Sequence, residues 1–363
     1  MWLYNNPVAI HAGNGCLDTL PALLGERRAI LIAFPEAAAL GLVERVQALL
    51  GERLLAVETS VQANPDIVWL APMYERLWRD YPQAECVIAL GGGSSIDCAK
   101  AMLTATPSGR FDELLAHLNG APLAQDGQHR ALIAIPTTAG TGSEVTPWAT
   151  LWDAAGGRKH SLHLPWTWPE AALIDPELML SLPRNTTLAS ALDALSHALE
   201  SLWNVHRNPV SAALAVSAAR IIVATLPALM RDPQQLVLRE KLAFAALLAG
   251  MAFSNTKTAL AHSLSYDITL QHGTAHGIAC SFSLPRILRL ALGRDAALDA
   301  QLLAIFDASS ADTAVEKLNH FLAELGVSTD PADYGIAPRD WDGRVAQALA
   351  GPRGKNFINA SGI

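Results

Sequence analysis

The pattern of apolar residues changes once along the chain, near residue 183, and this change constrains the fold more than any other feature. Before it, short apolar runs alternate with segments of helical period. The runs are residues 29–34, 54–59, 86–90, 131–136, 149–153 and 171–175. Several are apolar throughout, which is typical of strands covered on both faces. The alternation predicts a largely parallel sheet with helices on both sides.

From Thr186 onward the chain contains long segments of helical period, rich in alanine and leucine, and no convincing strand pattern. The proline and asparagine within residues 182–185 mark the boundary between the two patterns. The sequence therefore predicts an α/β N-terminal domain over residues 1–183 and an all-α C-terminal domain over residues 184–363.

Composition limits the class of protein and its partners. The chain has 363 residues, of which 51% are hydrophobic and 17% charged, as expected of a folded protein large enough for two domains. A net charge of -8 without a Lys/Arg cluster argues against a nucleic-acid partner. We find neither a signal peptide nor an uninterrupted apolar stretch of about 18 residues, so we expect no membrane partner. Four scattered cysteines without a CxxC pair indicate reduced thiols and a cytoplasmic protein.

Two loops rich in glycine follow predicted strands. GGGSS, at residues 91–95, follows the run 86–90 and opens a helical segment. Free backbone N–H groups and the helix dipole attract anions at such a point, and glycines let the backbone approach closely. The loop fits neither GxGxxG nor the Walker pattern, so alone it equally fits a tight turn. A second loop, PTTAGTGSE at residues 136–144, makes a nucleotide phosphate site the favoured interpretation.

One carboxylate and three histidines in the second half could bind a metal. Asp193 and His197 are four residues apart on a predicted helix, so both side chains project to one side. His262 and His276 lie in later helical segments. This donor set suits a divalent metal such as iron or zinc. The chain has 11 histidines, and a lone histidine in an apolar segment is usually a hydrogen-bonded core residue, so spacing alone leaves that alternative open.

These motifs resemble those of the iron-containing (group III) alcohol dehydrogenases. The matching segments stand in the same order over nearly the whole chain: GGGSSIDCAKA, IPTTAGTGSEVTP, DALSHALE, AHSLSY and HGIA. The resemblance implies a dinucleotide-binding α/β domain, a helical metal-binding domain, and a cleft between them where hydride passes between NAD(P)H and a small aldehyde or alcohol. It also implies a homodimer.

The resemblance assigns roles to individual residues. It implies that the metal, Fe(II) or alternatively Zn(II), is held by Asp193, His197, His262 and His276. It implies that the cofactor is contacted by a larger set, namely Gly91, Gly92, Gly93, Ser94, Asp97, Thr137, Thr138, Thr141, Lys159 and Asn64.

Two positions depart from the family pattern. Where the family commonly has a second histidine, four residues after the ligand His262, this chain has Tyr266. We therefore expect His262 and Tyr266 to be the catalytic residues, with Tyr266 as proton donor unless the proton travels through cofactor hydroxyls and water. His272 is a further candidate for the donor, although a loop histidine is the simpler interpretation of it. Phe34 and Pro35 follow the first strand of the predicted sheet in place of an acid, with Glu36 nearby, which leaves NAD and NADP both open.

Within the family, the segments TPWATLWD, KHSL, DALSHALESLWNVHRNP and AHSLSY are most similar to phosphonoacetaldehyde reductases, which reduce an aldehyde bearing a phosphonate to a hydroxyethyl phosphonate. An anionic tail would need cations. The candidates are Arg158, Lys159, His160, His206 and Arg207, each of which could instead be an ordinary surface residue. Reduction of another small aldehyde, and a lyase of the dehydroquinate-synthase type, are the alternatives.

Overall fold

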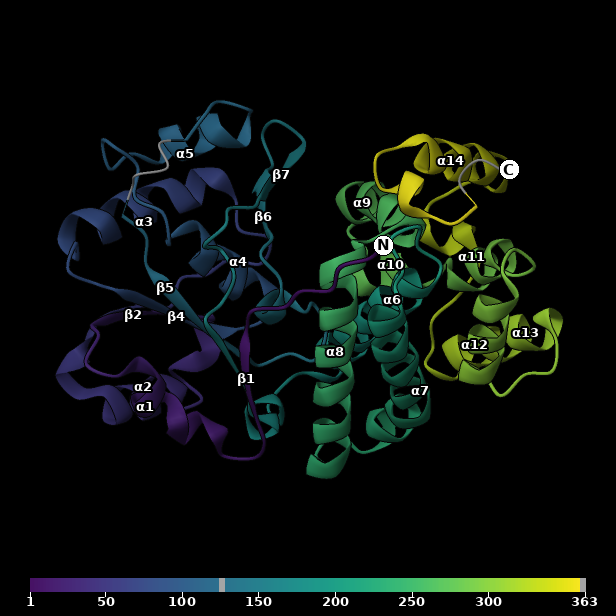
Figure 1. Cartoon of the computed structure of the whole chain (residues 1–363), viewed down its shortest axis with the longest axis horizontal. Helices are drawn as coiled ribbons and strands as arrows, with labels where there is room; N and C mark the ends of the chain where they lie inside the picture. Colours follow the sequence, from purple (N-terminus) through teal and green to yellow (C-terminus); the bar gives the residue numbers. More distant parts are fainter. Residues whose placement is uncertain (124–127, 360–363) are drawn as a thin grey trace. The chain divides into compact units, whose positions relative to one another are not determined.

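The computed structural model describes residues 1–123 and 128–359. The chain divides into two compact units. Figure 1 labels the helices and strands of each unit. The α/β unit comprises residues 7–137 and 143–178. The helical unit comprises the chain from Met179 onward together with residues 1–6 and 138–142. The predicted fold class, a parallel sheet followed by an all-α part, is confirmed.

Two segments belong to the helical unit although they lie before the predicted boundary. The N-terminal segment is tied to helix α8 (Leu236–Thr256), because the backbone N–H of Asn5 donates to the side-chain oxygen of Asn255 at 2.8 Å. In residues 138–142, a Cβ on Gly142 would lie 2.7 Å from the Cα of Gly250 on the same helix. Such long-range packing leaves no signal in the local pattern.

The α/β unit is built on a six-stranded parallel sheet in the order β1-β8-β5-β4-β2-β3. Its strands are β1 (Ala9–Ala12), β2 (Ala29–Ala33), β3 (Leu54–Glu58), β4 (Cys86–Gly91), β5 (Ala131–Pro136) and β8 (Ala171–Ile174). Its helices are α1 (Leu20–Leu24), α2 (Leu42–Leu50), α3 (Ile67–Asp80), α4 (Gly93–Ala101) and α5 (Phe111–Leu118), with 3-10 turns η1 (Cys16–Thr19), η2 (Pro35–Ala37), η3 (Gly51–Arg53) and η4 (Ser143–Val145).

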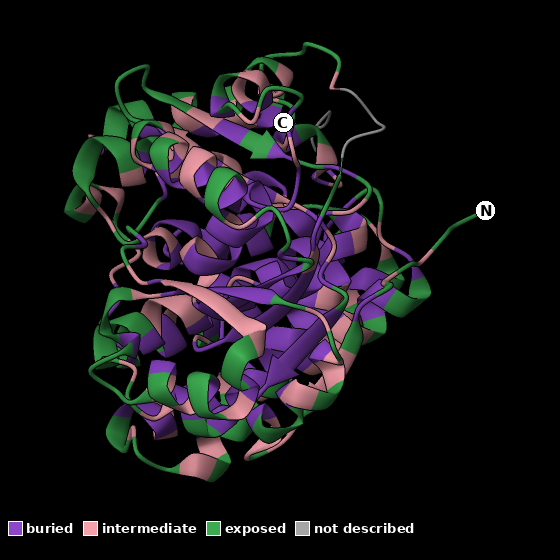
Figure 2. Ribbon diagram, turned by 90° about the vertical axis from the view of Figure 1, so that its left-hand side faces the viewer, coloured by how far each residue is buried: buried purple, intermediate pink, exposed green. Residues whose placement is uncertain are grey.

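The central strands are apolar throughout because each side chain enters one of two cores. Val87 and Ala89 of β4 join the core that contains α3, α4 and α5, whereas Ile88 and Leu90 join the core that contains α1 and α2. Alternate residues of a strand point to opposite faces, so a sheet covered on both sides buries them all. Figure 2 shows these strands as buried.

One predicted strand lies in a different place from the one expected. Residues 149–153 form β6 (Ala149–Asp153), which pairs antiparallel with β7 (Arg158–Leu162) in a separate hairpin. The expectation that this run joins the parallel sheet was wrong. An apolar run fixes the strand but not its partner, and the polar sequence of β7, RKHSL, gave no strand signal.

The helical unit begins with α6 (Arg184–Leu202), which packs against α7 (Pro209–Arg231), α8, α9 (Leu260–His272) and α10 (His276–Ser281). It continues with α11 (Leu284–Ala291), α12 (Ala296–Ile305), α13 (Ala311–Glu324) and α14 (Pro338–Ala350), and it contains the 3-10 turns η6 (Pro331–Tyr334) and η7 (Gly354–Asn356). A further 3-10 turn, η5 (Pro176–Met179), spans the boundary between the two units. No strand occurs between residues 186 and 359, as predicted.

Helix α7 is long and apolar enough to cross a membrane by length and composition alone, although Arg220 interrupts its apolar residues. About 44% of its most apolar window is buried inside the protein, where the helix packs against α6 and α8. A core helix of a helical unit is hydrophobic for the same reason that a membrane span is, so this finding is weak evidence for a membrane.

Candidate metal centre and phosphate loop

Helix α6 presents a carboxylate and an imidazole to the interior of the helical unit. Asp193 and His197 lie one helical turn apart and are 4% and 5% exposed. The Nε2 atom of His197 is 3.8 Å from the Oδ1 atom of Asp193. The His197 ring is stacked on Phe253 and on His262, with ring centroids 4.0 and 4.6 Å away.

Helices α9 and α10 bring two further imidazoles to the same carboxylate. The Nε2 atom of His262 on α9 is 3.3 Å from Asp193 Oδ1, and that of His276 at the start of α10 is 3.9 Å from it. The three predicted histidines therefore surround one oxygen of Asp193.

Cys280, which the sequence analysis did not single out, joins this group. Its Sγ is 3.7 Å from His276 Nε2. Ligand atoms of Asp193, His262, His276 and Cys280 all lie within 4.8 Å of one another, whereas His197 falls outside this tightest group. The spacing of Cys280, four residues after His276, was visible in the sequence and is the same as that between Asp193 and His197.

The donor atoms fit a divalent cation because several are buried without a partner. Asp193 Oδ1, His262 Nε2 and His197 Nδ1 accept or donate no hydrogen bond within the described chain. Unpartnered buried polar atoms are costly, and a cation would satisfy those that face the centre. Burial raises the pKa of Asp193, but the adjacent imidazoles outweigh it and hold this pKa well below its usual range. Burial lowers the pKa of His197 to about 4. An ionised carboxylate and a neutral imidazole are the states that bind metals.

Glu200, also missed from the sequence, fixes the orientation of His262. It lies on α6 one turn beyond His197, is 0% exposed, and its Oε2 is 2.7 Å from His262 Nδ1. Its carboxylate also accepts the backbone N–H groups of Ala259 and Ala261. A carboxylate at Nδ1 holds the proton there and leaves Nε2 free for a metal. The spacing could have revealed Glu200, because a residue seven positions after Asp193 lies on the same face of a helix.

Gly277 lets α10 lie directly against α6. A Cβ at this position would lie 2.7 Å from the carbonyl carbon of Ala189, closer than real side chains come. The glycine next to His276 thus serves the close approach of two helices.

Tyr266 lies one turn after His262 on α9, half-buried, and its ring is nearly parallel to that of His276 at a centroid distance of 6.1 Å. The guanidinium of Arg353 lies over the ring of Tyr266, 4.6 Å from the centroid of that ring. No local pattern pointed to Arg353, which lies in the C-terminal segment between α14 and η7.

The first glycine loop stands where ligands bind in sheets of this type. β3 lies on one side of β2 and β4 on the other, so the direction of winding reverses between β2 and β4. Ligands gather beyond the carboxyl ends of strands at such a switch point. Gly91 ends β4 with φ +149°, Gly92 precedes the first turn of α4 without a side-chain cap, and Gly93 begins the helix. A Cβ on Gly91 would lie 2.7 Å from the Cβ of Ser95.

The other predicted cofactor residues are divided between the units. Thr137 joins the first loop, because its backbone N–H donates to the carbonyl of Gly91 at 3.0 Å. Asn64 donates its backbone N–H to Ser94 Oγ at 3.2 Å, and Lys159 Nζ lies 5.7 Å from the Trp152 ring. These residues belong to the α/β unit, whereas Thr138 and Thr141 belong to the helical unit.

Asp97 is engaged by the protein itself. Its carboxylate accepts the hydroxyl of Ser143 at 2.7 Å and the backbone N–H of Thr150 at 2.9 Å. The fully buried Lys100, which was not singled out, donates to the carbonyls of Ser143 and Trp148 at 2.7 Å each. Both residues hold Ser143 and the start of the β6–β7 hairpin onto α4, so Asp97 supports the first glycine loop from behind.

Two of the five predicted cations for an anionic tail are already neutralised. Arg158 forms an ion pair with Asp153, and Arg207 forms one with Asp295 at 2.8 Å. His206 is exposed, and His160 is buried with its Nε2 unpartnered within the described chain.

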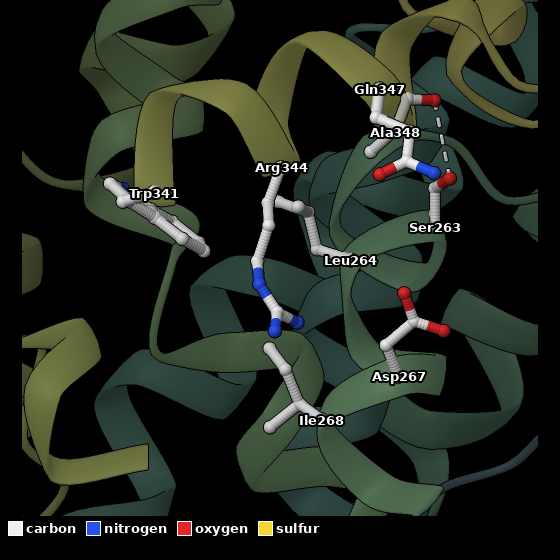
Figure 3. Close-up of a pocket in the computed structure, with 8 residues that line it drawn as sticks. All are labelled: Ser263, Leu264, Asp267, Ile268, Trp341, Arg344, Gln347 and Ala348. Atoms are coloured by element: carbon white, nitrogen blue, oxygen red, sulfur yellow. Dashed lines mark hydrogen bonds between the residues drawn. The ribbon is translucent and has the colours of Figure 1, made fainter. Parts of the chain in front are cut away.

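A cavity of about 200 Å³ lies between α9 and α14, lined by Ser263, Leu264, Asp267, Ile268, Trp341, Arg344, Gln347 and Ala348. Figure 3 shows Arg344 pointing across it, with Ser263 bonded to the carbonyl of Ala348. By helix geometry its α9 residues occupy the face opposite to His262 and Tyr266. This cavity is therefore separate from the metal donors.

The chain is similar to known proteins along its whole length. The family model described as "Iron-containing alcohol dehydrogenase" matches residues 7–176, and the one described as "Fe-containing alcohol dehydrogenase family, C-terminal" matches residues 187–361. The NAD-dependent methanol dehydrogenase of Bacillus methanolicus is 30% identical over 92% of this chain and 90% of its own length. The phosphonoacetaldehyde reductase of Streptomyces viridochromogenes is 37% identical, over 57% of this chain and 53% of its own length.

Among solved structures, the sulfoacetaldehyde reductase from Bifidobacterium kashiwanohense in complex with NAD+ superposes with a TM-score of 0.87. It is 26% identical, and the match covers 99% of this chain and 94% of that one. Because the two family models together span most of the sequence, the chain belongs to the iron-containing alcohol dehydrogenase family, whose members are oxidoreductases that act on CH–OH groups.

Proposed function

We propose that this protein is a metal-dependent, NAD(P)-linked aldehyde reductase whose metal is held by Asp193, His197, His262 and His276. The observation that carries the proposal is the convergence of buried donor atoms, some of them unpartnered, on Asp193 Oδ1. Family membership favours Fe(II), and Zn(II) suits the same donors. A cation bound there would supply Lewis-acid polarisation of a carbonyl group, and the nicotinamide would supply the hydride.

The residues of the chain would bind the cofactor and move one proton. The glycines that open α4 support binding of a pyrophosphate at the helix N-terminus. The Tyr266 hydroxyl would donate the proton that completes the alcohol. A relative bound to NAD+ supports NAD(H) as cofactor. Phe34, rather than an acid, follows β2, so we expect NADPH to be accepted as well.

The variant His262→Ala tests this proposal. This variant removes one ligand of the metal that would stabilise the developing negative charge, so the rate of aldehyde reduction should fall by about 10²-fold or more. NADH binding, measured by fluorescence, should persist because other residues build the glycine loop. His320→Ala, on the exposed face of α13, is the control. Undiminished reduction by His262→Ala would refute the proposal. A lyase would reveal itself in the wild type by causing no net oxidation of NADH.

For the substrate, we propose a small aldehyde with an anionic tail, phosphonoacetaldehyde being the first to test. Similarity to a phosphonoacetaldehyde reductase and to a sulfoacetaldehyde reductase supports this class. Arg353 supports it independently. Its guanidinium lies beside Tyr266, whose ring lies beside His276, and it forms no ion pair with any residue in 1–123 or 128–359. An arginine that forms no ion pair among the described residues and lies beside the proposed proton donor suits a phosphonate or sulfonate.

The variant Arg353→Met separates tail recognition from chemistry. Loss of a charge-assisted hydrogen bond should raise KM for phosphonoacetaldehyde by about tenfold or more. Neither kcat nor the KM for neutral propionaldehyde should change appreciably. Arg344→Met, which removes an arginine from the cavity of Figure 3, is the matched control. Equal effects of Arg353→Met on charged and neutral aldehydes would contradict an anionic substrate held by this residue.

A further inference from the structure

Cys280 lies on the same side of α10 as His276, because four residues complete about one helical turn. The cysteine side chain is 0% exposed, and its Sγ lies 3.7 and 3.9 Å from the two ring nitrogens of His276. It is one of four side chains whose ligand atoms all lie within 4.8 Å of one another. The thiol thus stands inside the donor cluster.

The atoms around this thiol point to a shared ligand. Asp193 Oδ1 and His262 Nε2 are buried and have no hydrogen-bond partner within the described chain. A cysteine that only filled space would leave both atoms unsatisfied. One cation between them would satisfy both atoms and would lie within reach of the sulfur.

We propose that Cys280 is a further direct ligand of the metal, through its thiolate sulfur, in addition to Asp193, His197, His262 and His276. The inference rests on the metal site proposed above. When the metal binds, the S–H bond breaks, the proton passes to solvent water, and a sulfur–metal bond forms without any change of oxidation state. Thiolates suit zinc better than they suit manganese, so Cys280 shifts the preference of the site toward zinc.

Cobalt substitution tests the bond directly. The metal-free protein is loaded with one equivalent of Co(II), and the near-ultraviolet charge-transfer band that only a thiolate ligand produces is recorded. The wild type should show this band, and Cys280→Ala and Cys280→Ser should lack it. The control Cys86→Ala, at a buried cysteine of β4, should retain it. Serine can still hydrogen-bond to His276, so loss of the band in Cys280→Ser reports coordination rather than packing.

Metal affinities provide a second readout. Chelator competition should show that Cys280→Ser binds Zn(II) roughly tenfold or more weakly than the wild type, with a much smaller change for Mn(II). If the Cys280 variants do not fold, X-ray absorption of the zinc-loaded wild type decides, because coordination requires a Zn–S distance of about 2.3 Å.

The outcomes separate this inference from the proposed function. Failure of the wild type to bind Co(II) at all would overturn the metal site itself. Stoichiometric binding without a charge-transfer band, a band that survives in both Cys280 variants, or a zinc site with only nitrogen and oxygen neighbours would overturn the role of Cys280 and leave the metal site intact.

Discussion

Glu200 is the residue whose replacement should separate support of the metal from direct binding of it. The substitution Glu200→Gln keeps the size of the side chain and turns one acceptor oxygen into an NH2 group. In the structure Oε1 accepts from the backbone of Ala261, and Oε2 accepts from Ala259 and lies 2.7 Å from His262 Nδ1. A glutamine can serve only one of these two sets of donors.

The effect of Glu200→Gln on stability and on metal affinity depends on which set of donors loses its acceptor. An N–H group left buried without an acceptor costs about 1–3 kcal/mol, so the free energy of unfolding should fall by about 3 kcal/mol. Where the new NH2 group faces His262 Nδ1, the imidazole must carry its proton on Nε2, the atom that faces Asp193. Loss of such a supporting carboxylate typically weakens metal binding 10- to 100-fold.

Two measurements check this reasoning, a chelator competition with Zn(II) and thermal unfolding of the metal-free protein. Glu240→Gln is the control, because this glutamate is exposed on α8 and serves no histidine. We expect Glu200→Gln to lower both metal affinity and Tm, and Glu240→Gln to lower neither. Wild-type metal affinity in Glu200→Gln would show that His262 needs no carboxylate to orient it.

Three further predictions concern the two units separately. Gly91→Ala places a Cβ against Ser95 at a positive φ, so it should weaken NADH binding measured by fluorescence and destabilise the protein by about 1–3 kcal/mol; unchanged NADH affinity would argue against the phosphate loop. Gly277→Ala drives a Cβ into Ala189, so metal affinity and Tm should both fall, and a variant with normal metal binding would contradict the role given to this close approach. Burial raises the pKa of Glu144 to about 7 from 4.5. Between these values the folded protein holds a proton that the unfolded chain releases, so stability should fall by about 3 kcal/mol as the pH rises from 4.5 to 7. Denaturant unfolding should show this slope in the wild type and not in Glu144→Gln.

The parallel sheet could be predicted because burial on both faces leaves a continuous apolar run in each central strand. The same reasoning fails where a strand is short or polar. β1, with the sequence AIHA, is a partly exposed edge strand, and β7 is largely polar. Neither presents a run that differs from a loop. The partner of β6 is decided by the turn at residues 154–157, which the apolar pattern does not describe.

Some residues of the candidate site could also be predicted from the sequence, and others could not. Helix geometry links Asp193, His197 and Glu200 in the sequence, so their common face on α6 could be deduced from spacing. Arg353 could not be found in this manner. It reaches Tyr266 because the C-terminal segment folds back, with a bridge between Asn204 and Phe357. That contact exists only once the helices have packed.

The site is stiff because each of its pairs lies on a helix rather than on a loop. Asp193 and His197 share α6, His262 and Tyr266 share α9, and His276 and Cys280 share α10, each pair four residues apart. These three helices pack on one another, so the backbone that carries each donor can shift only together with its helix. Metal affinity and the alignment of Tyr266 with His276 should therefore change together in any variant that shifts α10. A variant that alters only one side chain and leaves the helices in place should change either metal affinity or this alignment, but not both.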